Sequence, residues 1–130
     1  MAAASTAEVL QRGASALARG DFATFFENIA DDVVVHVPGR SSMAGDWHGK
    51  ATFMDSFSNQ VRATGGQGGE PHAVLAEGEH GVVLTEIRFP DGEVDRQVIV
   101  QHVRGGKVSE VWVYSSDQYR FDERLAAAGL

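Results

Sequence analysis

Residues 31–40 read DDVVVHVPGR, and they predict a β-strand at 32–37 around which the rest of the chain is arranged. Two aspartates turn the chain at the start, valines favour extended structure, and a Pro-Gly pair follows the end. Strand alternation places Val33, Val35 and Val37 on one face. The alternation leaves two interpretations of His36: a group bonded to backbone or facing solvent, or the polar group of a pocket.

The segments on either side of this strand predict helices first and hairpins later. Apolar residues at helical spacing predict helices over 6–19 and 21–30, with Asp21 as the N-cap of the second. The other expected elements are a Gly/Ser-rich loop at 38–49, a helix at 50–63, strands at 71–78, 80–89, 94–103 and 107–114, and a closing helix at 117–128. We therefore expect one α+β domain over residues 1–130, with helices covering one face of a curved antiparallel sheet.

The composition narrows the possible functions. The chain has 130 residues, a formal net charge of −7, 43% hydrophobic residues and no cysteine, so disulfides and thiolate metal sites are excluded. Acidic charge without a Lys/Arg cluster argues against nucleic acid and anionic membranes as partners. The N-terminal segment lacks the apolar run of a signal peptide or membrane span, so a soluble cytoplasmic protein is expected. The five histidines show no HxH or HxxxH spacing, and we expect neither a metal nor a cofactor.

Two turns determine which side chains share a face of the sheet. If Asp91-Gly92 and Gly105-Gly106 are both two-residue turns, Phe89 pairs with Val94 and Val103 pairs with Val108. The predicted inner face then includes Val83, Thr85, Ile87, Phe89, Val94, Arg96, Val98, Val100, His102, Ser109, Val111 and Val113. The predicted outer face includes Leu84, Glu86, Arg88, Asp95, Gln97, Ile99, Gln101, Val103, Val108, Glu110, Trp112 and Tyr114. This outer face is half apolar, and we expect a homodimer formed through it.

Several segments together resemble a known family. They are GDFATFFENIADDVVVHVPGR, AGDWHGKATFMDSF, VRGGKVSEVWVY and DQYRFDERL. The chain from about residue 6 to 128 resembles the SnoaL-like branch of the nuclear transport factor 2-like superfamily. The most specific features are the Asp-Asp-strand-Pro-Gly element, the Gly-x-x-x-Gly loop at 45–49 and the Gly-Lys-Val-x-Glu-x-Trp strand. The resemblance implies a cone-shaped, cystatin-like α+β barrel with a deep apolar cavity, and a tendency to dimerise.

The chain departs from two enzyme subfamilies of this superfamily. Epoxide hydrolases place an inward arginine and aspartate where this chain has Ile87 and Phe89, and their pocket asparagine matches His36. Ketosteroid isomerase has its general base immediately before the proline, where this chain has Val37. Its tyrosine partner on the first helix also has no equivalent. The resemblance therefore implies neither mechanism.

Polyketide cyclases use a histidine and an aspartate on the last two strands as an acid/base pair. The first position falls on Gln101 or His102, and the second falls on Ser116 or Asp117. A one-residue difference in alignment moves each side chain to the opposite face of its strand.

Two residues are the catalytic candidates. His36 would act as the acid/base, since an unperturbed imidazole pKa of about 6.5 permits both roles near neutral pH. Asp117 would orient His36 or share its proton, and the alternative is that Asp117 simply caps the closing helix. The ligand-binding candidates are Phe26, Trp47, His48, Phe89, Arg96 and His102. Their alternatives are core packing for Phe26, a loop anchor for Trp47, an edge salt bridge for Arg96 and a rim position for His102.

Two classes of function follow from these candidates. The first is a cofactor-free acid/base enzyme, of the polyketide cyclase, isomerase or hydratase/hydrolase type, acting on a small hydrophobic substrate. The second is a non-catalytic ligand-binding or dimeric interaction module, which the incomplete catalytic pairs favour. The sequence predicts a small hydrophobic organic ligand in either case.

Overall fold

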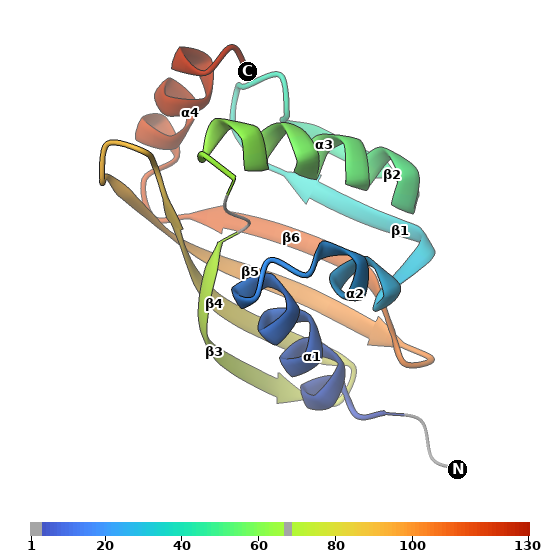
Figure 1. Cartoon of the computed structure of the whole chain (residues 1–130). Coiled ribbons are helices and arrows are strands. Elements are labelled where there is room, and N and C mark those ends of the chain that lie inside the picture. The colour runs from blue at the N-terminus through green and yellow to red at the C-terminus, as the bar shows by residue number, and fades with distance from the viewer. Residues whose placement is uncertain (1–3, 67–68) are drawn as a thin grey trace.

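The computed structural model describes residues 4–66 and 69–130, which form four helices and one six-stranded sheet (Figure 1). The helices are α1 (Thr6–Ala18), α2 (Phe22–Glu27), α3 (Lys50–Ala63) and α4 (Gln118–Ala127). The strands are β1 (Ile29–Val37), β2 (Gly45–His48), β3 (Glu70–Glu77), β4 (His80–Arg88), β5 (Val94–Arg104) and β6 (Lys107–Ser115). The α+β class is confirmed. Within the described residues, no helix is long and apolar enough to span a bilayer.

The sheet is open and mixed. Its strand order is β2-β1-β6-β5-β4-β3, so β2 and β3 form its edges. Four neighbouring pairs are antiparallel, but β1 runs parallel to β6, which corrects the expectation of a wholly antiparallel sheet. The sheet curves around α1, α2 and α3, which cover one of its faces, while α4 lies at one end (Figure 1). The apolar β1 residues Val33 and Val35 are buried on the helix-facing side.

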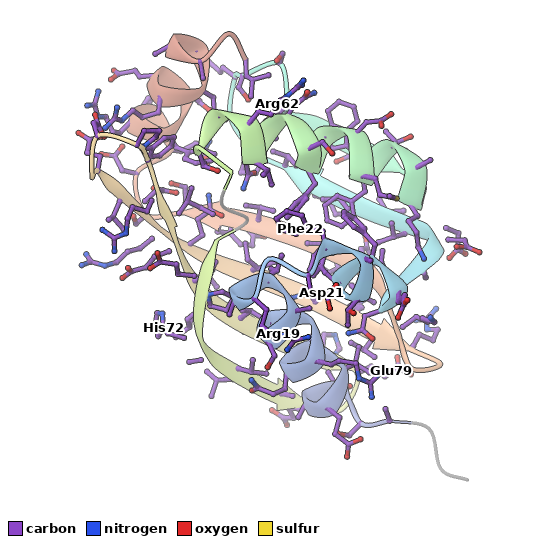
Figure 2. All side chains as sticks on the ribbon, viewed as in Figure 1. Arg19, Asp21, Phe22, Arg62, His72 and Glu79 are labelled. Atoms are coloured by element: carbon purple, nitrogen blue, oxygen red, sulfur yellow. The ribbon has the colours of Figure 1, made fainter. Side chains whose placement is uncertain are left out.

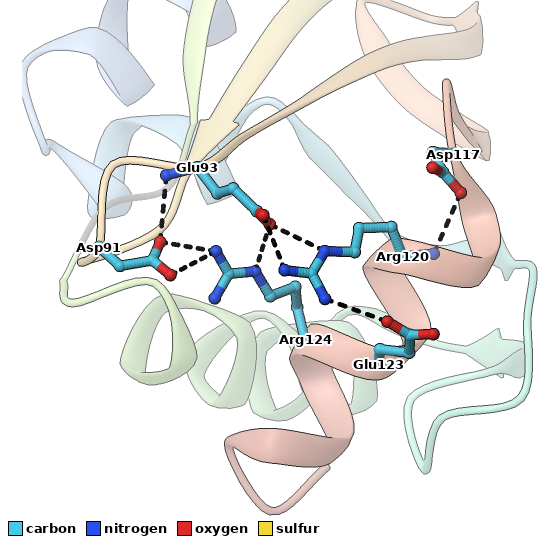
Figure 3. Close-up of polar contacts among 6 residues, drawn as sticks. All are labelled: Asp91, Glu93, Asp117, Arg120, Glu123 and Arg124. Carbon is cyan, nitrogen blue, oxygen red and sulfur yellow. Dashed lines mark hydrogen bonds and ion pairs between the residues drawn. The ribbon is translucent and has the colours of Figure 1, made fainter.

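Aspartate side chains cap the beginnings of α2 and α4. Asp21 accepts a hydrogen bond from the backbone N–H of Thr24 at 3.1 Å, and hydrogen bonds from Thr24 lower the pKa of this carboxyl. Asp117 accepts from the backbone N–H of Arg120 at 3.1 Å (Figure 3). Each cap satisfies an N–H group that has no partner within the helix. The Asp21 cap is confirmed, and so is the capping interpretation of Asp117.

Phenylalanine rings fill the space between α2 and α3. Phe22, labelled in Figure 2, contacts Phe57 of α3 with ring centroids 5.5 Å apart. Phe25 stacks on the same ring at 5.4 Å, and Phe26 meets Phe53 edge-on at 5.4 Å. Aromatic packing therefore holds these helices together.

A second apolar cluster closes the end of the sheet near α4. Its buried residues are Met43, Ile87, Phe89, Phe121 and Leu125. The guanidinium groups of Arg120 and Arg124 both bind Glu93, and Arg124 also binds Asp91, in the β4–β5 loop (Figure 3). The helix is thus fixed to the loop by both apolar and ionic contacts.

The β4–β5 turn has a different length from the expected one, and this changes one face of the sheet. The Phe89 N–H donates to the Glu93 carbonyl, and Arg88 pairs with Val94, so the loop has three residues. Gly92 adopts φ +91° there, as in a three-residue hairpin loop with a glycine bulge. A one-residue change of register reverses every side chain of β5.

The expected Gly105-Gly106 turn is confirmed, with both glycines at positive φ. A register shift between His102 and Val103 then adds an irregularity between β5 and β6. The inner face of β5 consequently contains Asp95, Gln97, Ile99, Gln101 and Val103. The prediction that Val94, Arg96, Val98, Val100 and His102 face inward is wrong for this reason, whereas Val83, Thr85, Ile87, Val111 and Val113 do face inward.

Candidate ligand cavity

A cavity of about 120 Å³ lies between the inner face of the sheet and the helices. Its walls come from α1, α2, α3 and all the strands except β2. Most of the lining is aliphatic or aromatic. The apolar lining residues are Val9, Leu10, Ala14, Leu17, Phe25, Ile29, Val35, Val37, Met43, Phe53, Phe57, Pro71, Val83, Ile87, Ile99, Val108, Val111 and Val113.

Among residues 4–66 and 69–130, the polar side chains of the lining are hydroxyls and amides. These residues are Asn28, Ser56, Gln60, Thr85, Gln97 and Gln101. Asn28 is already used in the fold, because its amide donates to the Val9 carbonyl at 3.2 Å. Thr85 is 7% exposed, and its Oγ1 is the one fully buried side-chain N or O atom without a hydrogen-bond partner within residues 4–66 and 69–130. Such a buried hydroxyl is costly unless something in the cavity can bond to it.

A buried carboxylate lies beside the cavity. Asp95 is 7% exposed and accepts hydrogen bonds from Ser115 Oγ at 2.7 Å and from Gln97 Nε2 at 3.0 Å. The pKa of Asp95 is raised, chiefly by burial and further by the negative charge of Asp117, although the hydrogen bonds from Ser115 and Gln97 act in the opposite direction. Gln97 is the link between this carboxylate and the cavity, since its side chain contacts both.

His36 lies on the opposite face of the sheet, so the prediction that it belongs to the cavity is wrong. Its ring stacks on Trp112 at 5.3 Å, and its two nitrogens contact Asp46 at 2.8 Å and Glu110 at 2.6 Å. Hydrogen bonds to Glu110, and then to Asp46, raise the pKa of the imidazole. The physical reason is alternation: Val35 and Val37 line the cavity, so the residue between them points away.

Two further candidates belong to this outer face. Arg96 is largely exposed and lies 3.6 Å from Glu86, which agrees with the edge salt-bridge alternative. His102 contacts Glu110 at 3.8 Å and meets the Trp112 ring at a centroid distance of 4.9 Å. The β5 register places both residues outside the cavity.

The remaining candidates are not among the lining residues of the cavity. Trp47 donates its indole N–H to the Met43 carbonyl at 2.8 Å and packs against the main core, as the loop-anchor alternative predicted. His48 is exposed on β2, and Phe26 is a buried core residue. Phe89 packs against Phe121 and the Arg124 guanidinium. Asp117 caps α4, and the structure does not bring it to His36.

Sequence reasoning did not select the polar residues that do face the cavity or its edge. Thr85 was correctly placed on the inner face but was not chosen as a site residue. Asp95, Gln97 and Gln101 were placed on the wrong face by the assumed two-residue turn. The signal that could have found them is Pro90-Asp91-Gly92, because a three-residue hairpin loop commonly ends in a glycine at positive φ.

The helices packed on one face of a curved six-stranded sheet define a nuclear transport factor 2-like, or cystatin-like, α+β fold. A protein of unknown function with a cystatin-like fold from Xanthomonas campestris superposes with a TM-score of 0.83, at 22% identity over 94% of this chain and 98% of that one. A nuclear transport factor 2-like protein from Burkholderia xenovorans LB400 gives 0.69, at 21% identity over 98% of each chain. TerC, co-crystallised with polyporic acid, gives 0.76, at 18% identity over 93% of this chain and 98% of that one.

Within this class, the chain belongs to the SnoaL-like domain family, whose model matches residues 10–111. Among curated proteins, none matches the chain. The match begins at Leu10, within α1, and ends at Val111, within β6. It therefore includes most of the residues that line the cavity.

Proposed function

We propose that this protein binds a small, uncharged, mainly apolar organic molecule in the cavity between the helices and the sheet. The observation that supports this most directly is the cavity itself, about 120 Å³ with a largely aliphatic and aromatic lining. An apolar cavity of about 150 Å³ suffices for benzene, so the expected ligand has about the size of one ring. Burial of an uncompensated charge there would be costly, which favours a neutral ligand.

The geometry favours binding over acid/base catalysis. A general acid or base must come within hydrogen-bond reach of the reacting group, directly or through one water. The described lining consists of apolar, hydroxyl and amide side chains, while His36 and Asp117 have partners elsewhere. Two ionisable groups, Asp95 and Arg12, each bond an amide side chain of the lining, Gln97 at 3.0 Å and Asn28 at 3.3 Å, and neither of them is a lining residue.

A ligand screen by thermal shift and calorimetry tests this proposal. Single-ring compounds such as toluene and phenol should raise the melting temperature, because a ligand at about 100 times its Kd adds about 2.7 kcal/mol of stability. Val113→Phe would fill part of the cavity and should abolish the shift. Leu75→Phe is the matched control, since Leu75 is 61% exposed on β3 and does not line the cavity.

Two results would count against the proposal. One is that no single-ring compound stabilises the wild-type protein. The other is that Val113→Phe and Leu75→Phe, both folded by circular dichroism, show the same ligand response as the wild type.

We also propose that two copies associate through the outer face of the sheet. Val82, Val100, Trp112 and His36 are register partners and form one row across four strands of this face. Val98 and Tyr114, in the neighbouring row, are 39% and 52% exposed, although both side chains are largely apolar. This face also carries charged residues such as Glu86, Arg96 and Glu110, and a mixture of exposed apolar and charged side chains is found in many protein–protein interfaces.

The oligomeric state tests this second proposal. Light scattering after size exclusion should give twice the monomer mass at micromolar concentration. Tyr114→Glu should shift the protein toward the monomer, whereas Met54→Glu, at an exposed position on α3, should not. A monomeric wild-type protein would refute the proposal.

A further inference from the structure

Three polar side chains form a row across the inner face of the sheet. Thr85 on β4 pairs with Gln97 on β5, and Gln97 pairs with Ser115 on β6. Side chains directly opposite each other on antiparallel strands have Cβ atoms about 4.5–5.5 Å apart. Thr85 and Gln97 both line the cavity, so one small group of a ligand can contact both.

A hydrogen bond to Asp95 fixes the orientation of the Gln97 side-chain amide. Its Nε2 donates to Asp95 Oδ2 at 3.0 Å, and the other Asp95 oxygen is occupied by Ser115 Oγ at 2.7 Å. A carboxylate can only accept hydrogen bonds, so it selects the NH₂ side of the amide. The amide oxygen is then the side of Gln97 that remains as an acceptor.

The Thr85 hydroxyl completes this arrangement. It is more than nine-tenths buried, lies in the cavity wall and has no partner within the part of the chain that the structure describes. A hydroxyl can donate one hydrogen bond and accept others. Thr85 and Gln97 thus offer a donor and an acceptor next to each other in an otherwise apolar wall.

We propose that Thr85 and Gln97 recognise a hydroxyl group on a single-ring ligand, and that Asp95 is the positioning residue that fixes the Gln97 amide. The ligand O–H donates to Gln97 Oε1 and accepts from the Thr85 hydroxyl, while its ring occupies the apolar part of the cavity. This inference rests on the proposed binding function and adds the chemical class of the ligand, a phenol-like alcohol.

Calorimetric titration with phenol and with toluene tests the inference, because the two rings differ in one polar group. The measured quantity is the ratio of the toluene Kd to the phenol Kd. Thr85→Val and Gln97→Met should each lower this ratio by about threefold to tenfold, as expected for the loss of neutral hydrogen bonds. Thr85→Ser keeps the hydroxyl and should retain the wild-type ratio.

Two further variants separate recognition from general packing. Gln101→Met changes another amide of the cavity wall and should leave the ratio unchanged. Asp95→Asn allows the Gln97 amide to turn, so it should weaken phenol binding by about threefold to tenfold and leave toluene binding unaltered. A merely structural role for Asp95 would instead weaken both ligands equally.

The outcomes distinguish this inference from the proposed function. If both compounds bind and the ratio is the same in wild type, Thr85→Val and Gln97→Met, the hydroxyl-recognition inference is wrong and the binding function stands. If neither compound binds to the wild-type protein, the proposed function fails, and the inference fails with it.

Discussion

The Thr85→Val substitution should stabilise the ligand-free protein. The Thr85 hydroxyl is buried without a partner in the described structure, and an unsatisfied buried polar group costs about 1–3 kcal/mol. Valine has nearly the same shape as threonine, and both residues favour β-strands. The substitution therefore creates no void in the core and no strain in β4. We expect the free energy of unfolding to rise by about 1–2 kcal/mol, which corresponds to about 3–8 °C in melting temperature for a chain of this size.

Urea denaturation and calorimetry would measure this change against a matched control. Thr64 is also buried, but its hydroxyl donates to backbone carbonyl oxygens of Gln60 and Val61. Thr64→Val should therefore lower stability by about 1 kcal/mol, opposite in sign to Thr85→Val. If Thr85→Val destabilises the protein as much as the control does, the hydroxyl has a stabilising partner and the reasoning about the cavity is wrong.

Three other predictions concern the packing and the ionic contacts. Because the folded state raises the pKa of His36, the contacts of its imidazole with carboxylates stabilise the fold fully below about pH 6.5. This contribution is lost as the pH rises through the folded-state pKa. The difference in free energy of unfolding between wild type and His36→Gln, measured by urea titration, should therefore shrink between pH 6 and 9. Arg124→Ala should lower the melting temperature more than Arg120→Ala, since Arg124 is the less exposed of the two and also packs on an aromatic ring; equal losses would argue against that packing. Gly81→Ala should cost about 1–3 kcal/mol in chemical denaturation, because its new methyl group would overlap Leu10, and a neutral result would show that α1 can shift away.

Local patterns in the sequence were sufficient to predict most of the architecture. Helical spacing of apolar residues gave α1, α2 and α3, and the Asp21 cap followed from the side chain's ability to bond the first helical N–H groups. Alternation gave the later strands. The short strand β2 was not predicted, because the Gly/Ser-rich composition of 38–49 favours a loop and its pairing with β1 depends on tertiary contacts.

The face of β5 that lines the cavity could not be predicted, because the assignment depends on the length of the β4–β5 turn. Alternation assigns side chains to faces only after the register is known, and one residue reverses the whole set. The β4–β5 loop has one residue more than expected. As a result, Asp95, Gln97 and Gln101 face the inner side of the sheet, where Arg96 and His102 were expected. For His36 the alternation left both faces open, and the resemblance to other family members favoured the pocket, whereas the structure buries the neighbouring Val35 and turns His36 to the outer face.

The inner face combines two features that a purely structural core would avoid. Asp95 is buried, and none of the ion pairs of the described residues involves it. Because its pKa is raised, ionisation at neutral pH makes the folded state less stable relative to the unfolded chain. Ser115 and Gln97 offset part of this cost by donating to the carboxylate. Thr85 Oγ1, in contrast, has no hydrogen-bond partner within the described residues. The Thr85 hydroxyl lowers the stability of the protein while it has no partner. A hydrogen bond from a ligand hydroxyl would remove this penalty and so contribute to binding. Local departures of this kind are concentrated at functional sites, and here they occur where the cavity wall is otherwise apolar.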